Sequence, residues 1–325
     1  MGTRLSSVFG RWIPGFLVAM AMAAEAAAQA YPNRPISLVI PFSSGSNVEI
    51  LIRAMSAEVS TMLGQTVVVE SRAGANLRLP VIAMRKAAPD GYFLAGVNDA
   101  LLVTQTIADP NFKLEPGKDF TPIAFLMSFP LVVVSHPSLP FRDIKGLIDY
   151  AKSNPGKINF AGGSGSITQT TSERMRGLAG VDWAYVPYKE GGLVMPDLLQ
   201  GRVHLTISGS LLKPSIDTGK LIPLATTGQS RWSLFPNLPT LQESGLNMFA
   251  ITWYGIIAPP GTPADIVKRL NTAYNDAIKS PAVAKRLSDF GMSPGYPTPE
   301  QFESLTRSEV SNWTPIIKAA GIRFD

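Results

Sequence analysis

Short runs of β-branched and aliphatic residues alternate with helical patterns along most of this chain. Residues 36–40 read ISLVI, and the apolar residues Leu51, Met55, Val59 and Leu63 then recur every four positions before Gly64. Such a run is typical of a buried strand, the four-residue recurrence is typical of an amphipathic helix, and glycine commonly ends a helix. The alternation predicts an α/β fold in which helices cover parallel sheets.

Nine strands are expected from this pattern. They lie at Ile36–Ile40, Thr66–Val69, Tyr92–Val97, Ile123–Leu126, Leu131–Ser135, Ile158–Ala161, Ala184–Val186, Val203–Ile207 and Ile222–Ala225. Thr262 is expected to cap a helix with Pro263 in its first turn, and Thr298 with Gln301 is expected to form a capping box. The chain has 325 residues, of which 45% are hydrophobic. Because this length exceeds the usual size of a single core, two α/β lobes are expected.

Residues 1–30 have the features of a secretory signal. Arg4 and Arg11 give a basic start, residues 12–24 are apolar, and residues 28–30 read AQA, a small-x-small cleavage site. The alternative, a membrane anchor, needs about 20 consecutive apolar residues, and this run is shorter. We therefore expect export to the periplasm, with cleavage after Ala30.

Composition excludes several classes of function. The chain has no cysteine and two histidines, so a disulfide framework, a thiolate metal site and a multi-histidine metal cluster are excluded, and no metal or cofactor is expected. The formal net charge of +5 is small for the length, and the 29 basic residues are scattered among only 16% charged residues. A nucleic-acid partner is therefore not expected, whereas a small anionic ligand is compatible with this charge.

Two loops between a predicted strand and a predicted helix are rich in glycine and serine. Residues 43–47 read SSGSN and residues 162–168 read GGSGSIT. Amides at a helix N-terminus lack partners and carry the positive end of the helix dipole, so each loop can grip a carboxylate. The alternative is that Ser46 or Asn47, and Ser166 or Thr168, only cap their helices. Neither loop is a P-loop or a complete G-x-G-x-x-G motif.

Nine short motifs run in order from residue 31 to the C-terminus. They are YPNRPI at 31–36, PFxxG at 41–45, LGQxVVVExR at 63–72, APDGY at 88–92, KDFxP at 118–122, YAKxNPGK at 150–157, VPYK at 186–189, APxGTP at 258–263 and KAAGI at 318–322. With this set the chain resembles the solute receptors of tripartite tricarboxylate transporters, also called Bug receptors.

The resemblance implies a non-catalytic periplasmic binding protein of the type II, Venus-flytrap class. Two α/β lobes, residues 31–130 with 252–325 and residues 131–251, would be joined by two crossover segments and enclose a ligand cleft. The loops at 42–47 and 162–168 would bind a carboxylate there, partly through ordered water. The implied partners are a small organic carboxylate and the large and small integral membrane subunits of the transporter, and the receptor is expected to act as a monomer.

Two departures from the family pattern and a set of aromatic residues bear on the ligand. Arg78 stands where an asparagine is usual, and it can either clamp a carboxylate or pair locally with an acid. Ser208 stands where many relatives have an aspartate, which favours plain carboxylates over amino acids. Trp253, Tyr254 and Phe42 can provide flat apolar walls, although buried aromatic residues are common in cores. The expected ligand is an aromatic or short aliphatic mono- or dicarboxylate, such as a terephthalate-like acid.

The candidate ligand-binding residues are therefore spread over both predicted lobes. They are Phe42, Ser43, Ser44, Gly45, Ser46, Asn47, Arg78, Asn98, Gly163, Ser164, Gly165, Ser166, Thr168, Tyr188, Ser208 and Trp253.

Two other functions remain open from the sequence. An exported serine hydrolase would use Ser164 or Ser166 with His136 or His204, although residues 162–166 miss the last glycine of a G-x-S-x-G elbow. A ligand sensor that signals to a histidine kinase would use the same two lobes as a transport receptor.

Overall fold

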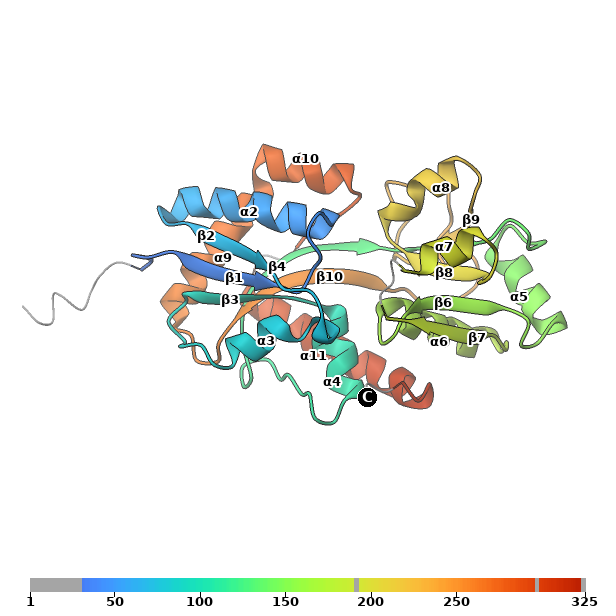
Figure 1. Cartoon of the computed structure of the whole chain (residues 1–325), viewed down its shortest axis with the longest axis horizontal. Coiled ribbons are helices and arrows are strands. Elements are labelled where there is room, and N and C mark those ends of the chain that lie inside the picture. Colours follow the sequence, from blue (N-terminus) through green and yellow to red (C-terminus); the bar gives the residue numbers. More distant parts are fainter. Residues whose placement is uncertain (1–30, 190–192, 296–297, 323–325) are drawn as a thin grey trace, which may run out of the picture.

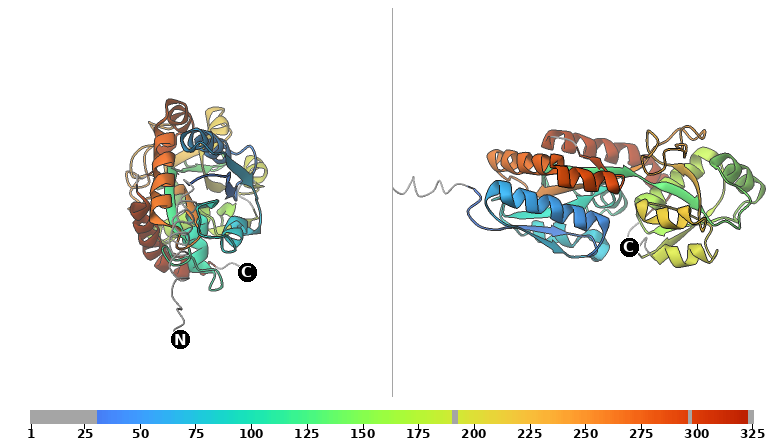
Figure 2. Two further views of the ribbon diagram at one scale, coloured as in Figure 1. Left: turned by 90° about the vertical axis from the view of Figure 1, so that its left-hand side faces the viewer. Right: turned by 90° about the horizontal axis from the view of Figure 1, so that it is seen from above.

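The computed structural model describes residues 31–189, 193–295 and 298–322. The predicted signal sequence, residues 1–30, and its cleavage site lie outside these residues. Two mixed sheets follow one another along the long axis of the molecule, each flanked by helices (Figures 1 and 2). We call the part built on the first sheet lobe 1 and the part built on the second sheet lobe 2.

Lobe 1 has a six-stranded sheet in the order β11-β4-β10-β3-β1-β2. Its elements are β1 (Ile36–Ile40), α2 (Asn47–Leu63), β2 (Val67–Ser71), α3 (Leu79–Met84), β3 (Phe93–Asn98), α4 (Gln105–Ala108), β4 (Thr121–Pro130), β10 (Ile251–Ala258), α9 (Ala264–Lys279), α10 (Pro281–Asp289), β11 (Ser293–Pro294) and α11 (Pro299–Ala319). Helices α2 and α9 cover one face of this sheet, and α3, α4 and α11 cover the other (Figure 1).

Lobe 2 has a five-stranded sheet in the order β7-β6-β8-β5-β9. Its elements are β5 (Val132–Ser135), α5 (Ile144–Ser153), β6 (Asn159–Gly163), α6 (Ile167–Ala179), β7 (Ala184–Tyr188), α7 (Val194–Leu199), β8 (Leu205–Ser208), α8 (Lys213–Asp217) and β9 (Ile222–Thr226). The chain changes sheet between β4 and β5 and again between β9 and β10.

The nine predicted strands are confirmed as β1 to β9, but the prediction of parallel sheets is wrong in part. Strand β10 is not among the predicted strands, and it pairs antiparallel with both β3 and β4. In lobe 2, β5 pairs antiparallel with β8 and β9. The chain leaves lobe 1 along β4 and returns along β10, so these crossover strands must run in opposite directions.

The predicted helix ends are confirmed at two places and wrong at a third. Gly64 ends α2 in the left-handed conformation, and Thr298 and Gln301 form the capping box of α11. Thr262 does not cap α9, because its hydroxyl donates to the carbonyl of Pro259 at 2.8 Å and the helix begins at Ala264. No helix in the described parts of the chain is both long and apolar enough to cross a bilayer.

A buried threonine ties the two crossover segments together. The Thr227 hydroxyl accepts from the amide of Leu131 at 2.9 Å and donates to the carbonyl of Ala250 at 2.6 Å. The amide of Thr227 donates to the carbonyl of Leu131, and its carbonyl accepts from the amide of Ala250, both at 2.8 Å. Thr227 therefore fixes both crossovers relative to each other where the chain passes between the lobes.

Candidate ligand-binding site

The loop between β1 and α2, which we call loop 1 (residues 42–47), ends at the start of a helix that faces lobe 2 (Figure 1). Ser46 caps α2 by accepting a hydrogen bond from the amide of Glu49 at 3.2 Å. Gly45 has a φ of 83°, a conformation that glycine adopts without strain, and its amide donates to the Glu49 carboxylate at 3.2 Å. Ser43 and Ser44 are exposed, so their hydroxyls can reach a ligand.

The loop between β6 and α6, which we call loop 2 (residues 163–168), has a similar construction in lobe 2. Gly165 has a φ of 62°, and its amide donates to the side-chain oxygen of Gln169 at 2.7 Å. Ser166 stands at the N-cap of α6, but its hydroxyl donates to the carbonyl of Gly163 at 2.7 Å and caps no amide. Ser164 is exposed, and its amide donates to the carbonyl of Tyr188.

Both helix starts retain amides that can bind an anion. Within the described residues, no group of the protein accepts from the amides of Asn47 and Val48 in α2, or from those of Ile167, Thr168 and Gln169 in α6. These amides stand in the first turn, where the helix dipole is positive. Ser46 acts as a cap, as the alternative interpretation expects, but this cap uses one amide of α2 and leaves two others open.

Three aromatic residues form a floor between the loops, which we call the aromatic floor. The ring of Phe42 meets Tyr254 edge-on at 4.9 Å between centroids, and Tyr254 is stacked with Phe129 at 5.9 Å. A Cβ atom at Gly209 in lobe 2 would lie 3.2 Å from the Phe129 ring, so this ring reaches the other lobe. The sequence did not indicate Phe129, because an apolar residue in an apolar strand carries no signal of function.

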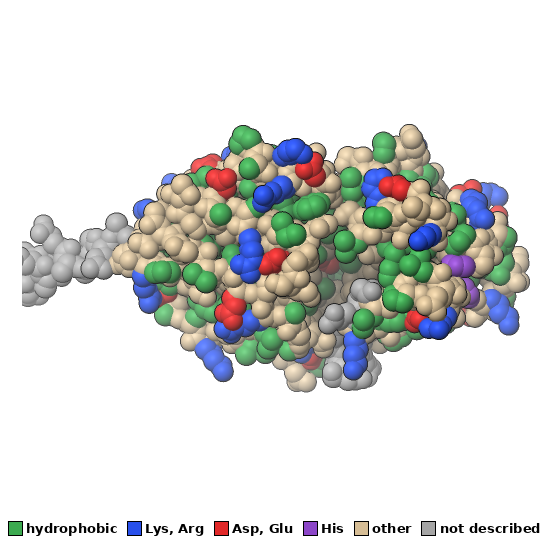
Figure 3. Space-filling view, turned by 45° about the horizontal axis from the view of Figure 1, so that its top comes forward, with side chains coloured by type: hydrophobic (Ala, Val, Ile, Leu, Met, Phe, Trp, Pro, Cys, Tyr) green, Lys and Arg blue, Asp and Glu red, His purple; other side chains and the backbone are tan. Residues whose placement is uncertain are grey.

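A hydrogen bond connects loop 2 to the end of β8, which lies beside this floor. The Thr168 hydroxyl donates to the carbonyl of Ile207 at 2.7 Å, at the end of β8. Ser208 and Gly209 follow directly and are partly exposed. Loop 1, the aromatic floor, the end of β8 and loop 2 are thus joined by consecutive contacts at the junction of the lobes, where the surface is hollowed (Figure 3).

Two other candidate residues have partners within their own lobe. Asn98, at the end of β3, is buried, and its side-chain oxygen accepts from the amide of Leu101 at 3.1 Å. The Tyr188 hydroxyl donates to Asp197 at 2.6 Å, and this carboxylate raises the pKa of the phenol. Asp197 also pairs with Arg202 at 2.9 Å. The roles of Asn98 and Tyr188 toward a ligand stay predictions.

The structure favours local pairing for Arg78 over a clamp on the ligand. Its guanidinium contacts Asp109 at 2.8 Å and Gln105 at 2.6 Å and lies 4.3 Å from the ring centroid of Phe112. A hydrogen bond from the amide of Asn111, reinforced by Arg78, holds the pKa of Asp109 below its usual range. In this conformation the guanidinium anchors its own loop to α4 and to the segment after it, and a contact of Arg78 with the ligand stays a prediction.

The structure contradicts the prediction for Trp253. It is fully buried and lies against Phe125 and Phe302, with ring centroids 5.7 and 5.5 Å away. Successive residues of a strand point to opposite faces, so Tyr254 faces the aromatic floor while Trp253 faces the core under α11. The prediction that Trp253 forms a wall of the cleft is therefore wrong.

The two histidines lie far from the serines of loop 2. The His204 side chain accepts from the amide of Asn159, at the beginning of β6, whereas Ser164 follows the end of this strand. Five residues of strand separate these positions by about 16 Å. His136 contacts the hydroxyl of Ser138 at 2.7 Å and packs beside Gly201, at the same end of the sheet as His204. The hydrolase alternative is excluded by this geometry, since neither histidine can activate Ser164 or Ser166.

Comparison with known proteins places the chain in a family. The model described as "Tripartite tricarboxylate transporter family receptor" matches residues 51–322. The chain belongs to this receptor family. Protein BugT of Bordetella pertussis is 31% identical over 325 residues, covering 99% of this chain and 98% of BugT.

Solved structures of receptors with the same two-lobed fold are also similar to this one. The structure of R. palustris Rpa4515 with adipate has a TM-score of 0.81 and 31% identity, covering 90% of this chain and 99% of that one. MatC (Rpa3494) from Rhodopseudomonas palustris with bound malate has a TM-score of 0.77 and 28% identity, covering 88% and 100%. The protein is therefore a periplasmic solute-binding receptor of this family and not an enzyme.

In this receptor, the loop before α3 has a strained backbone. Ala75, Asn76 and Leu77 have φ values of 46°, 52° and 68°, in the left-handed region that most residues avoid. The side chain of Gln105 donates to the carbonyl of Asn76 at 2.6 Å and accepts from Arg78, which holds the loop in place. Ala75, Asn76 and Leu77 thus hold a backbone conformation that glycine residues at these positions would adopt without strain.

Replacing Ala75 by glycine is expected to stabilise the receptor. The exposed Ala75 would lose its left-handed strain, so the free energy of unfolding should rise by about 0.5 to 1 kcal/mol. Urea denaturation measures the change. The matched control is Ala57→Gly on the exposed side of α2, which should lower stability by about 1 kcal/mol. Equal losses in both variants would contradict the strain.

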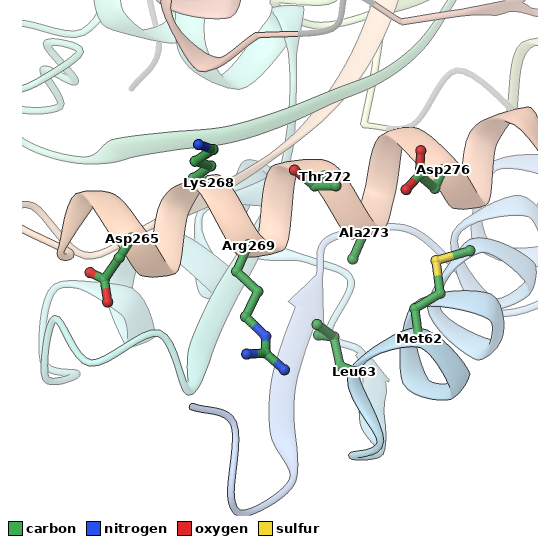
Figure 4. A pocket seen from close by; sticks show the side chains of 8 residues that line it. All are labelled: Met62, Leu63, Asp265, Lys268, Arg269, Thr272, Ala273 and Asp276. Carbon is green, nitrogen blue, oxygen red and sulfur yellow. The ribbon is translucent and has the colours of Figure 1, made fainter. Parts of the chain in front are cut away.

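A shallow depression between the end of α2 and α9 is a different feature of the receptor. It has a volume of about 530 Å³ and is lined by Met62, Leu63, Lys268 and Arg269, among others (Figure 4). Loop 1 lies at the opposite end of α2, a helix of 17 residues and therefore about 25 Å long. The depression is separate from the two loops and takes no part in the site described above.

Proposed function

We propose that this receptor captures a small organic carboxylate between its lobes and delivers it to the large and small membrane subunits of a tripartite transporter. The observation that carries the proposal is the pair of loops: each begins a helix at the lobe junction with open amides and exposed serine hydroxyls. Such neutral donors replace the water molecules that hydrate a carboxylate, and they bind it without altering it chemically. Ligand contact with both lobes then favours the closed arrangement over the open one.

The chemistry of the floor supports an acid with an apolar body. Phe42 and Tyr254 are partly exposed and offer flat surfaces to an aromatic or aliphatic chain, and the buried ring of Phe129 stacks with Tyr254. Ser208, partly exposed beside the floor, carries no charge to hold a ligand ammonium group. The structures with adipate and malate are of relatives that bind dicarboxylates. The ligand class is an aromatic or short aliphatic mono- or dicarboxylate, terephthalate-like acids included.

Calorimetric titration of refolded, ligand-stripped protein tests the function. The panel contains adipate, malate, terephthalate and benzoate, and we expect at least one acid to bind with a stoichiometry near one and to be recovered unchanged by chromatography. Absence of heat and of any thermal shift with every acid would overturn the proposal.

Ser208→Asp places a negative charge beside the floor and should weaken binding of the acid at least about tenfold by repulsion. The matched control is Ser153→Asp at the exposed end of α5, which adds the same charge far from the loops and should bind as wild type does. Equal affinities of the two variants would place the site elsewhere.

Partner and location are tested in cells. Export with cleavage after Ala30 is checked by N-terminal sequencing, which should begin at Tyr31. Cells that lack the receptor should lose uptake of the labelled acid. Undiminished uptake, together with loss of a histidine-kinase response, would assign the receptor to sensing.

A further inference from the structure

The two loops share a hydrogen bond, which we call the lock, in addition to their open amides and exposed serines. In each, a glycine with positive φ donates its amide to the side chain four residues later: Gly45 to Glu49 at 3.2 Å, and Gly165 to Gln169 at 2.7 Å. Each lock fixes the course of the loop just before the open amides of the helix. The lock is a carboxylate in lobe 1 and a neutral amide in lobe 2.

Glu49 would be an obstacle to an anionic ligand if its charge acted alone. Its side chain is only 6% exposed and touches the loop itself, so little water screens it from an anion bound there. Its charge would also oppose the positive potential that the first turn of α2 offers to a ligand.

Arg53 neutralises this charge. Its guanidinium pairs with the Glu49 carboxylate one helical turn further on, and this pairing lowers the pKa of Glu49, which keeps it ionised. Arg53 also donates to the carbonyl of Val69 on β2 at 3.0 Å, which holds the guanidinium in place although half of its side chain is exposed.

Lobe 2 reaches the same neutrality by another route. Gln169 carries no charge, and the position one turn later is Glu173, which pairs with Arg176 at 2.6 Å. The sequences G-x-x-x-E-x-x-x-R in lobe 1 and G-x-x-x-Q-x-x-x-E-x-x-R in lobe 2 therefore both leave the loop without net charge, because each glutamate is paired with an arginine.

We propose that Arg53 is a positioning and charge-masking residue for ligand binding: it hides the charge of the Glu49 lock from the bound carboxylate, as Gln169 does in lobe 2 by being neutral. The inference rests on the proposed function, because it concerns an anionic ligand at these loops. It explains why an acidic residue can stand in the first turn of α2, in contact with an anion-binding loop.

Titration of Arg53→Met, Glu49→Gln/Arg53→Met and Arg53→Lys with the acid that wild type binds best tests the proposal. Arg53→Met should weaken binding at least tenfold. The double variant, which keeps an acceptor for Gly45 but no charge, should return to within about threefold of wild type, and Arg53→Lys should do the same. If the ion pair only stabilised the helix, the double variant would bind as weakly as Arg53→Met, and this result would overturn the proposal.

Gln169→Glu supplies an independent arm if Arg53→Met fails to fold. It introduces an unmasked carboxylate at the loop 2 lock and should weaken the same acid at least tenfold, whereas Gln169→Glu with wild-type affinity would overturn the proposal. Thermal melting reports the folding of each variant. If wild type binds an acid and every variant binds it equally well, only the masking role is contradicted. If wild type binds no acid, the proposed function is contradicted as well.

Discussion

Replacing Asp99 by asparagine should make this receptor more stable at pH 8 and remove the part of the pH dependence of its stability between pH 4 and pH 8 that comes from Asp99. Asp99 is buried at the end of β3 and accepts from the Thr252 hydroxyl at 2.6 Å and the Trp253 amide at 3.3 Å, both on β10. Burial, reinforced by the charge of Glu309 on α11, raises the pKa of Asp99 to about 7, despite these hydrogen bonds.

The direction of the stability change follows from the number of protons that Asp99 binds in the folded and in the unfolded protein. Between its ordinary pKa near 4 and about 7, the folded protein keeps a proton on Asp99 that the unfolded chain has released. The stability that protonated Asp99 contributes is complete below pH 4 and is lost as pH rises through about 7. A rise of this size corresponds to about 4 kcal/mol, so the asparagine variant should exceed wild type by about 2 to 4 kcal/mol at pH 8.

Urea denaturation at intervals from pH 4 to pH 9 measures this profile. Asparagine keeps an oxygen for Thr252 and Trp253, so the two proteins should be similarly stable at pH 4. Asp109→Asn is the control with the opposite sign: the pKa of Asp109 is lowered, so this variant should be less stable than wild type throughout this range, with the difference closing only below pH 4. Parallel profiles for wild type and Asp99→Asn would show that Asp99 is ionised in the fold.

The second large effect is expected at the crossovers. Thr227→Val should lower the free energy of unfolding by about 2 to 4 kcal/mol, because it leaves the amide of Leu131 and the carbonyl of Ala250 buried without the hydroxyl that joins them. The side chain keeps its volume, so the loss reports hydrogen bonding and not a cavity.

Thr306→Val is the matched control for this substitution. Thr306 is equally buried, but its hydroxyl donates only to the carbonyl of Phe302 within α11, a group that the helix also bonds. We expect a loss below about 1 kcal/mol there. A similar loss in both variants would mean that the tie between the crossovers adds nothing to stability.

Local patterns predicted much of the fold and part of the candidate site. The four-residue recurrence from Leu51 to Leu63, the glycine that ends α2, and the capping box of α11 depend on neighbours within one or two turns, and the structure has all three. Thr262 does not cap α9, because its hydroxyl donates to the carbonyl of Pro259 in the preceding turn.

The side-chain contacts at the site depended on segments that are distant in sequence. Arg78 was interpreted from its position in a motif, but its partner Asp109 follows α4, and only the tertiary fold brings the two side chains together. Trp253 and Tyr254 are adjacent in sequence and equally aromatic, and only the pairing of β10 between β3 and β4 decides which ring meets the core and which meets the floor.

By itself, the sequence determined the nine strands, the end of α2, the start of α11, the two glycine- and serine-rich loops and the resemblance to the receptor family, because these depend on residues close together in the chain. Tertiary structure alone decided the direction of β10, the partners of Arg78 and Asp99, the burial of Trp253 and the contact of Phe129 with Gly209. Each of these depends on segments distant in sequence, whose contacts are set by packing and by the partner that each buried polar group must find.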